Sequence, residues 1–366
     1  MDLISTYANG VSELTKFSTE EEQPPLVVDV IVNPHAGFFK SQAALTGRIR
    51  ELESRLEELR ARSPRRRVEI NTVHFTERPG HARVITEGIL DREVRSGSGI
   101  ERLLIGCGGD GTSNEICSAL VGADGPLLDR LKLVRLPLGT GNDVADASTF
   151  AEAYDLILGG QHTETTGALQ VTSGPTAGPG AAGRQVHYAF NIASIGLDAY
   201  IVELTNRLKR IIPGDAYRSV VDIASLFYER HVTPLPMDIR ISSDWGENKV
   251  NSFVPSMVVM GVSGSRTYGG HLHVLPGVEN VCLVSRMGVL DKIRNKKLFY
   301  EGRHRGLPWV SFHHGKRLEV EYRGRIPMQL DGELVWLSPQ DFPVRMDLLP
   351  PRIKVLRPTA RPARPV

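Results

Sequence analysis

Two glycine-rich turns, each with an aspartate, are the residues of this chain whose types and spacing point most directly to chemistry. Residues 108–112 are Gly-Gly-Asp-Gly-Thr, and residues 137–143 are Pro-Leu-Gly-Thr-Gly-Asn-Asp. Each follows a short apolar run and precedes a segment that is compatible with a helix. A strand, a glycine turn and a helix together aim backbone N–H groups at a phosphate. A carboxylate suits such a turn when a divalent cation lies beside it, so the turns predict a site for a nucleotide and Mg²⁺.

Two better-known phosphate motifs do not explain these turns. Residues 106–111 match Gly-x-Gly-x-x-Gly, the dinucleotide fingerprint, which is weak when it stands alone. Here it follows the third expected strand of its domain, and the next strand ends at Leu136-Pro137 without an acidic residue for a ribose. The phosphate-binding loop Gly-x4-Gly-Lys-Ser/Thr is absent from the sequence. A phosphate-handling protein must therefore use another arrangement here.

The segments around the turns alternate between strand and helix patterns. Residues 26–32 are an apolar run typical of a buried strand, and residues 41–60 carry leucine and isoleucine at helical spacing. Residues 67–75 and 79–94 continue the pattern as a strand and a helix. This alternation predicts a parallel α/β sheet, in which ligands bind at the carboxyl ends of the strands. We therefore expect the turns after all four strands to converge.

The pattern changes after about residue 150, where short strand-like runs predict a second, strand-rich domain. A Gly/Pro-rich stretch at residues 173–180 predicts a flexible loop. The expected parts of the chain are a polar tail (1–24), an α/β nucleotide-binding domain (25–150), a β-rich lipid-substrate domain (151–340), a C-terminal segment that can return to the first domain (341–357) and a disordered tail (358–366).

Composition narrows the class of protein. The 366 residues suffice for two domains, and a net charge of +2 is too balanced to argue for nucleic-acid binding. Basic residues do cluster, at 65–67, 207–210, 294–297 and 303–305. Solvated surface and contact with an anionic membrane both remain open as explanations.

Cysteine use and hydropathy predict a cytoplasmic protein that contacts a membrane peripherally at most. The three cysteines lack metal-binding spacing, which suggests a reducing compartment. The first 25 residues have no apolar core typical of a signal peptide, and no run approaches the ~20 apolar residues of a membrane span.

Two aspartates further along are ambiguous on local grounds. Asp198 stands just before a helical segment, where a helix cap would explain it equally well. Asp331-Gly332 lies between two short strand-like runs, and Asp-Gly is a common hairpin turn there.

Taken in order, the motifs resemble the diacylglycerol kinase catalytic-domain family, which includes bacterial lipid kinases and the sphingosine and ceramide kinases. The resemblance runs from about residue 26 to 337, and its most specific elements lie at 108–115 and 137–143. The second element favours lipid kinases over NAD kinases, which share only the first. The remaining motifs are Asn-Pro-x-x-Gly at 33–37, Asn191 with Gly196-x-Asp198, Tyr-Gly-Gly at 268–270 with Pro276, and Asp331-Gly332-Glu333.

The resemblance implies an α/β nucleotide domain, a β-sandwich-like second domain, ATP and Mg²⁺ as cofactors, and ATP bound between the domains. It implies Asp331 as the catalytic base and Asp110, Asp143 and, through a water network, Asp198 near the magnesium ion. The residues that it implies around the nucleotide are Asn33, Thr76, Gly108, Gly109, Asp110, Gly111, Thr112, Gly139, Thr140, Gly141 and Asn142.

The sequence also departs from the family pattern. Some bacterial members bind a structural Mg²⁺ with an acidic loop after the position of Pro276, but here the loop is short and only Glu279 supplies a carboxylate. Divalent cations require several oxygen ligands, so Glu279 is a weak candidate for a metal ligand. Asp146 stands where family members often carry a basic residue.

We therefore expect an ATP-dependent lipid kinase that transfers the γ-phosphoryl group to a lipid hydroxyl, with diacylglycerol as the default acceptor. The alternatives are a catalytically impaired nucleotide- or lipid-binding regulator and a kinase of a soluble substrate such as NAD. The expected partner is a lipid at a membrane surface and not a nucleic acid, and a homodimer stays open.

Overall fold

A computed structural model describes residues 2–19, 24–97, 99–139, 145–159, 162–174, 185–208, 227–268 and 272–358. The chain divides into two compact units, Met1–Thr166 with Pro351–Val366, and Gly167–Pro350. The first unit therefore extends past the expected boundary at residue 150. Most of the expected loop at 173–180 and nearly all of the tail at 358–366 lie outside the described residues.

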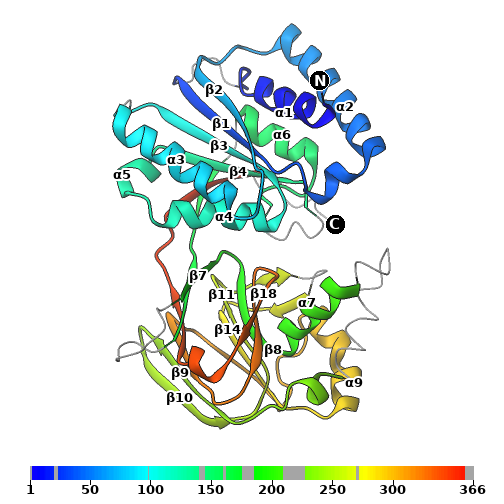
Figure 1. Ribbon diagram of the computed structural model, residues 1–366, viewed down its shortest axis with the longest axis vertical. Coiled ribbons are helices and arrows are strands. Elements are labelled where there is room, and N and C mark those ends of the chain that lie inside the picture. The colour runs from blue at the N-terminus through cyan, green and yellow to red at the C-terminus, as the bar shows by residue number, and fades with distance from the viewer. Residues whose placement is uncertain are drawn as a thin grey trace, which may run out of the picture. The chain divides into compact units, whose positions relative to one another are not determined.

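The first unit is a six-stranded, mostly parallel sheet in the order β2-β1-β3-β4-β20-β5, in which β5 alone runs antiparallel to its neighbour. Helices α1, α2 and α6 lie on one face and α3, α4 and α5 on the other (Figure 1). The strands are β1 (Leu26–Val32), β2 (Val68–Phe75), β3 (Glu101–Gly108), β4 (Leu131–Pro137), β5 (His162–Thr166) and β20 (Ile353–Arg357). The helices are α1 (Leu3–Leu14), η1 (Gly37–Lys40), α2 (Gln42–Arg62), α3 (His81–Ser96), α4 (Asp110–Val121), α5 (Gly125–Leu128) and α6 (Phe150–Leu158).

Strand β1 shows why this sheet forms. All seven of its residues are buried, as expected for a parallel strand covered by helices on both faces. Val28, Val30 and Val32 alternate along the strand and pack in the core beneath α1, α2 and α6. Asp29 is a charged residue on the opposite face, where it pairs with Arg102 and accepts a contact of 2.9 Å from His74 Nε2.

The expectation of a polar tail at residues 1–24 was wrong for helix α1. Tyr7, Ala8, Val11 and Leu14 recur on one face of this helix and are fully buried against the sheet and α2. Close packing on α2 needs Gly10, because a Cβ there would lie 2.6 Å from Cδ2 of Leu52. The serine, threonine and asparagine side chains between the apolar positions hid this narrow stripe in the sequence.

The second unit contains two six-stranded antiparallel sheets, in the orders β10-β9-β16-β19-β6-β7 and β15-β14-β11-β8-β17-β18, and a hairpin of β12 and β13. The strands are β6 (Leu169–Ser173), β7 (Gln185–Ala189), β8 (Ile192–Gly196), β9 (Met237–Ser243), β10 (Gly246–Phe253), β11 (Pro255–Gly261), β12 (Arg266–Tyr268), β13 (Leu272–Leu275), β14 (Val281–Ser285), β15 (Val310–His313), β16 (Arg317–Glu321), β17 (Ile326–Leu330), β18 (Glu333–Leu337) and β19 (Val344–Leu348). Its helices include α7 (Leu197–Leu208), α9 (Val289–Tyr300) and η2 (Pro339–Asp341).

The two sheets of the second unit face each other across one core, which makes it a β-sandwich. Ile239 and Ile241 of β9 and Val258 and Met260 of β11 belong to the same buried cluster, so both sheets contribute alternate residues to it. The expected fold class, an α/β domain with a parallel sheet and a strand-rich second domain, is thus confirmed.

The outer face of the β11-containing sheet carries a second apolar layer. Met257 and Val259 of β11 point away from the sandwich core and pack in a cluster that also contacts Phe299 of α9. The sequence predicted a basic cluster at 294–297 and did not predict helix α9. No helix among the described residues is both long and apolar enough to cross a bilayer.

Replacement of Leu14 by alanine should lower the free energy of unfolding by about 2–5 kcal/mol, because it leaves a cavity where a fully buried side chain packed. Urea unfolding measures this change. Leu3→Ala is the matched control on the same helix, since 37% of Leu3 is exposed, and it should cost less than about 1 kcal/mol. Equal losses for the two variants would show that α1 does not pack as described.

Candidate active site

The carboxyl ends of the parallel strands of the first unit meet at one edge of the sheet. Asn33, directly after β1, donates its backbone N–H to Cys107 O at 2.9 Å and its side-chain amide to Thr112 Oγ1 at 2.9 Å. Thr76, directly after β2, is buried and donates its backbone N–H to Val32 O at 2.9 Å. The first glycine turn is therefore bonded to the end of β1, and Thr76 lies at the adjacent strand end.

The two glycine turns touch each other. A Cβ on Gly109 would lie 3.2 Å from Cα of Gly139, and a Cβ on Gly108 would lie 2.5 Å from the Thr112 side chain. Gly109 has an ordinary φ of −93°, so glycine is needed there for space and not for a left-handed backbone. The turns after β3 and β4 therefore converge as expected, while Thr140, Gly141, Asn142 and Asp143 lie outside the described residues.

Helix α4 starts within the first turn, at Asp110, with Gly111 and Thr112 in its first helical turn. The backbone N–H groups at the start of a helix favour an anion. One turn further on, Glu115 accepts hydrogen bonds from the backbone N–H groups of Gly80 (2.7 Å) and Ala82 (2.9 Å). Glu115 thereby fixes the start of α3, and with it the loop that follows Thr76, relative to the phosphate turn.

Asp146 has a structural role where a basic residue was expected from the family pattern. Its buried carboxylate accepts hydrogen bonds from Arg135 N and Nη2, both at 2.7 Å, and pairs with Arg357 Nη1 at 2.9 Å. Arg135 belongs to β4 and Arg357 to the returning strand β20. The residues that follow the second glycine turn are thus anchored to both strands.

The described residues do not fit Mg²⁺ at Glu279, while Asp110 stays a prediction as a magnesium ligand. Magnesium typically takes one or two protein carboxylates together with substrate phosphates, and Asp110 lies in the phosphate turn itself. Glu279 is instead held by Arg305, whose Nη1 and Nη2 lie 3.0 and 2.5 Å from its two carboxylate oxygens. These hydrogen bonds lower the pKa of Glu279, and the guanidinium occupies the side of the carboxylate that a cation would need. Among the described residues, no three His, Cys, Asp or Glu side chains form a metal-binding group.

In the second unit, Asp331 and Gly332 form the two-residue turn between β17 and β18. Both have positive φ, +51° and +90°, as a tight hairpin turn requires. The Asp331 carboxylate reaches the neighbouring strands, where Oδ2 accepts from Phe190 N at 2.5 Å and Oδ1 accepts from Asn191 N and Ile192 N at 2.9 Å each. The expected hairpin is present, and three backbone donors fix the orientation of the carboxylate.

Asp198 lies in the first turn of α7 and is 2% exposed. Its Oδ2 accepts hydrogen bonds from Ser194 Oγ and from Gln329 Nε2, the latter at 3.1 Å. A carboxylate with this little exposure needs such donors to offset the loss of water. A helix cap alone does not account for Asp198, because the side chain is buried and accepts hydrogen bonds from two other side chains.

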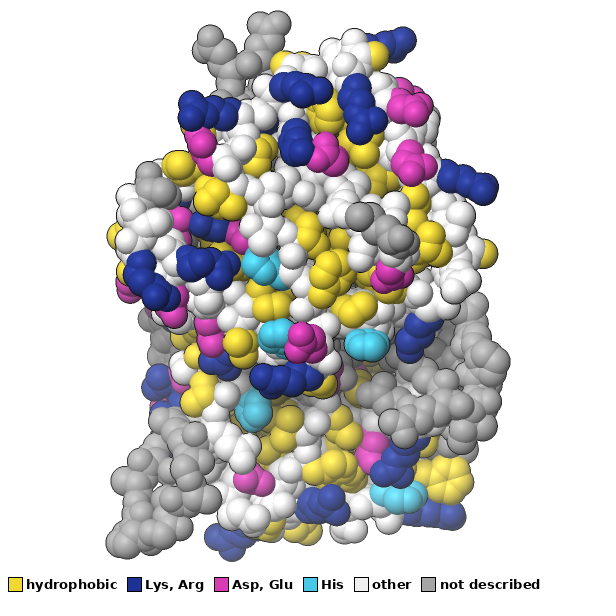
Figure 2. Space-filling model, turned by 45° about the horizontal axis from the view of Figure 1, so that its top comes forward, with side chains coloured by type: hydrophobic (Ala, Val, Ile, Leu, Met, Phe, Trp, Pro, Cys, Tyr) yellow, Lys and Arg dark blue, Asp and Glu magenta, His cyan; other side chains and the backbone are white. Residues whose placement is uncertain are grey.

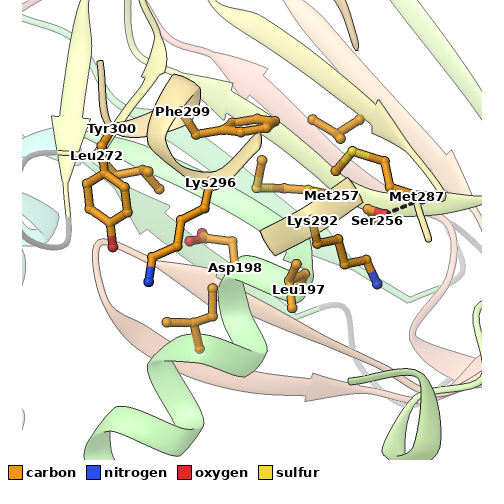
Figure 3. A pocket seen from close by; sticks show the side chains of 12 residues that line it. Leu197, Asp198, Ser256, Met257, Leu272, Met287, Lys292, Lys296, Phe299 and Tyr300 are labelled. Atoms are coloured by element: carbon orange, nitrogen blue, oxygen red, sulfur yellow. Dashed lines mark hydrogen bonds between the residues drawn. The ribbon is translucent and has the colours of Figure 1, made fainter. Parts of the chain in front are cut away.

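A mostly apolar pocket opens beside Asp198 (Figure 3). The close-up shows the Asp198 carboxylate among the side chains of the pocket, with Lys292 and Lys296 of α9 on either side of it. Apart from Asp198, this pocket could not be predicted from the sequence, because its wall comes from five separate elements. The lining residues are Leu197, Asp198, Ile201, Ser256, Met257, Leu272, Val284, Met287, Lys292, Lys296, Phe299 and Tyr300.

Comparison with known proteins finds lipid and diacylglycerol kinases among the relatives of this chain. The family model described as the diacylglycerol kinase catalytic domain matches residues 28–168. A Pseudomonas fluorescens protein named "Probable lipid kinase YegS-like" is 28% identical over 256 residues, which are 64% of this chain and 73% of that protein. A Bacillus subtilis protein named "Diacylglycerol kinase" is 23% identical over 248 residues, which are 66% of this chain and 74% of that protein.

Solved structures share the fold. A crystal structure of a diacylglycerol kinase from Bacillus anthracis aligns with 91% of this chain and 97% of its own, at 15% identity and a TM-score of 0.52. Two further structures from that organism, each 19% identical to this chain, give TM-scores of 0.56 and 0.58. At these identities the likeness concerns the fold alone.

Gly109→Ala should weaken ATP binding roughly tenfold, because the new Cβ forces the two glycine turns apart and small displacements of positioning groups are costly. Calorimetric titration at fixed Mg²⁺ measures the affinity, and thermal melting should stay near that of the parent. Gly125→Ala is the matched control, since a Cβ at Gly125 meets nothing within 4 Å. Unchanged ATP affinity in Gly109→Ala would mean that the contact between the turns does not shape the nucleotide site.

Proposed function

We propose, from the premise that the chain belongs to the diacylglycerol kinase catalytic-domain family through residues 28–168, that it is an ATP-dependent lipid kinase. It transfers the γ-phosphoryl group of ATP to a hydroxyl group of a lipid, with diacylglycerol as the default acceptor. The family supports the kinase activity. The lipid acceptor rests on one observation, which is the apolar pocket beside Asp198.

The pocket combines the two chemistries that a lipid alcohol needs. Met257, Met287 and Phe299 supply an apolar wall for a hydrocarbon chain, and Asp198 supplies a buried carboxylate that can accept a hydrogen bond from a hydroxyl group. Lys292 is paired with Glu229 at 2.8 Å, so part of the local positive charge is already neutralised. A small polar acceptor would leave most of these apolar side chains without an apolar group to pack against.

The phosphate half of the reaction belongs to the glycine turns of the first unit. Phosphoryl transfer requires mainly positioning and neutralisation of charge. The N–H groups at the start of α4 suit the phosphates, and Asp110 is the residue that would hold Mg²⁺, which neutralises phosphate charge when bound. Asn33 and Thr112 hold each other and so fix the edge of this site.

The acceptor must lose a proton while its oxygen bonds to the γ-phosphorus and the bond between that phosphorus and the ADP oxygen breaks. A nearby carboxylate takes the proton. We propose Asp331 for this role, because three backbone donors orient it, and we assign Asp198 to binding of the acceptor in the pocket.

A screen of lipid and soluble acceptors with labelled ATP tests the proposed function. Label in the lipid phase with diacylglycerol or another lipid alcohol supports it. Transfer to NAD alone would make the protein a soluble-substrate kinase, and ATP binding without transfer to any acceptor would make it a regulator. Either result contradicts the proposal.

Asp331→Asn should reduce phosphate transfer roughly 10²- to 10⁴-fold, because asparagine cannot accept the proton. ATP affinity should stay within about twofold of the parent, since neither the phosphate turn nor α4 is changed. The same substitution should lower the free energy of unfolding by about 1–3 kcal/mol, because the amide nitrogen of asparagine would leave one backbone donor without an acceptor. Steady-state kinetics and thermal melting measure both effects.

Two further variants separate the roles of the carboxylates. Glu333→Gln changes the exposed neighbour of the turn and should transfer phosphate like the parent. Asp198→Asn should mainly raise KM for the lipid. If Asp198→Asn shows the large loss of kcat while Asp331→Asn loses only stability, then Asp331 is a turn residue and Asp198 takes the proton.

Helix α9 offers a local surface for membrane contact. Leu290 and Ile293 are 67% and 42% exposed, and with the exposed Arg294 and Lys297 they follow helical spacing along one side. The same helix contributes Lys296 and Phe299 to the pocket wall. Elsewhere, on the face drawn in Figure 2, basic, acidic and apolar side chains are interspersed.

Arg294→Gln combined with Lys297→Gln should weaken sedimentation with anionic vesicles by about tenfold or more at low salt, because each basic residue near such a surface contributes about 1 kcal/mol. Binding of the parent should fall as salt rises. Arg60→Gln with Arg62→Gln removes the same charge from the exposed end of α2 and should have little effect. Equal binding of the parent to neutral and anionic vesicles would contradict an electrostatic contact.

A further inference from the structure

Gln329 is a buried polar residue of the second unit. It lies on β17, is 1% exposed and stands directly opposite Ser194 of β8. Its Oε1 accepts the backbone N–H of Gly332 at 2.8 Å. Its Nε2 donates to Ser194 Oγ at 2.9 Å and to Asp198 Oδ2 at 3.1 Å. One side chain therefore joins the hairpin turn after β17 to the carboxylate at the pocket.

The two ends of this side chain face groups of opposite kind. The backbone N–H of Gly332 is a donor, while the Asp198 carboxylate is an acceptor. Of the common side chains, only a carboxamide accepts at one end and donates at the other in every protonation state. Glutamate can accept from Gly332, but once ionised it repels Asp198, and an aliphatic side chain satisfies neither group.

The other hydrogen-bond partners of Asp198 and Asp331 lie on strand β8 and in the two residues before it. Asp331 is bonded to the backbone of Phe190, Asn191 and Ile192, and Asp198 accepts a hydrogen bond from Ser194. Gln329, on the neighbouring strand, links these groups, because it is hydrogen-bonded to Ser194, Asp198 and the turn residue Gly332 together. A shift of Asp198 relative to the hairpin would break at least one of these bonds.

We infer that Gln329 is a positioning residue, which holds the pocket carboxylate of Asp198 and the Asp331–Gly332 turn in one fixed arrangement for phosphate transfer to the acceptor. The inference rests on the proposed function, since both carboxylates are assigned to the acceptor. It adds a residue that touches neither acceptor nor nucleotide and acts through Asp198 and the turn.

Gln329→Met keeps the length of the side chain and removes both hydrogen-bonding ends. It should lower kcat/KM for the lipid about 10- to 100-fold, as expected when a charged carboxylate loses a partner, while ATP affinity stays within about twofold. Met328→Leu is the matched control on the same strand, since Met328 packs in the sandwich core and should transfer phosphate like the parent.

Gln329→Glu gives a readout that a merely structural role would not move. A protonated glutamate can still accept from Gly332 and donate to Asp198, whereas an ionised one places two carboxylates in contact. Such a pair raises the pKa at which its shared proton is lost. The variant should therefore lose activity relative to the parent as pH rises. Lys292, Lys296 and Tyr300 line the same pocket, but they are identical in the two proteins, so their titration cancels in the comparison.

Three outcomes would overturn the inference. The first is a folded Gln329→Met protein with the parent's kcat/KM for the lipid, and the second is a Gln329→Glu pH profile that matches the parent's. The third is a parallel loss of ATP affinity, which would indicate general disruption. If Gln329→Met does not fold, Gln329→Glu assayed at acidic pH decides alone. A parent protein that phosphorylates no lipid would instead contradict the proposed function itself.

Discussion

The close approach of the two glycine turns is the constraint on which the proposed nucleotide site of the first unit depends. Gly109 lies so near Gly139 that a Cβ would come within 3.2 Å of the neighbouring backbone. Such contact is possible only where parallel strands end side by side, and β3 and β4 do so because helices cover both faces of their sheet. Asn33 bonds to Thr112 from the end of β1, while Asp146 secures the chain after the second turn.

In the second unit, hydrogen bonds to carboxylates organise the residues that we propose for the acceptor. There, hydrogen bonds hold the buried carboxylate of Asp198 and the partly exposed carboxylate of Asp331, and each bond offsets part of the cost of removing a charge from water. Asp331 has three backbone donors, and Asp198 has Ser194 and Gln329. Networks of this kind are rigid when fully satisfied and costly when one member is lost. The hairpin geometry of Asp331 is therefore compatible with the chemical role that we propose for it.

In the loop after Pro276, the guanidinium of Arg305 lies beside the carboxylate that was a candidate ligand for a divalent cation. Glu279 was considered as a metal ligand because it is the carboxylate of a shortened loop, yet both of its oxygens face the Arg305 guanidinium. An arginine side chain needs no further oxygen ligands, so it suits a site with a single carboxylate, whereas a divalent cation requires several. This pairing could not be read from the spacing, since Arg305 lies far along the chain from Glu279.

Local sequence patterns were enough to predict the glycine turns that follow the strands of the first unit, the class of both domains and the hairpin at Asp331. These features depend on residues near one another in the chain, where spacing and backbone preference decide the structure. Only the tertiary structure decided which partners those residues have. The burial of α1, the pocket beside Asp198 and the contacts of Gln329 each depend on which strands pair and in what register, because a shift of one residue turns every side chain of a strand to the other face.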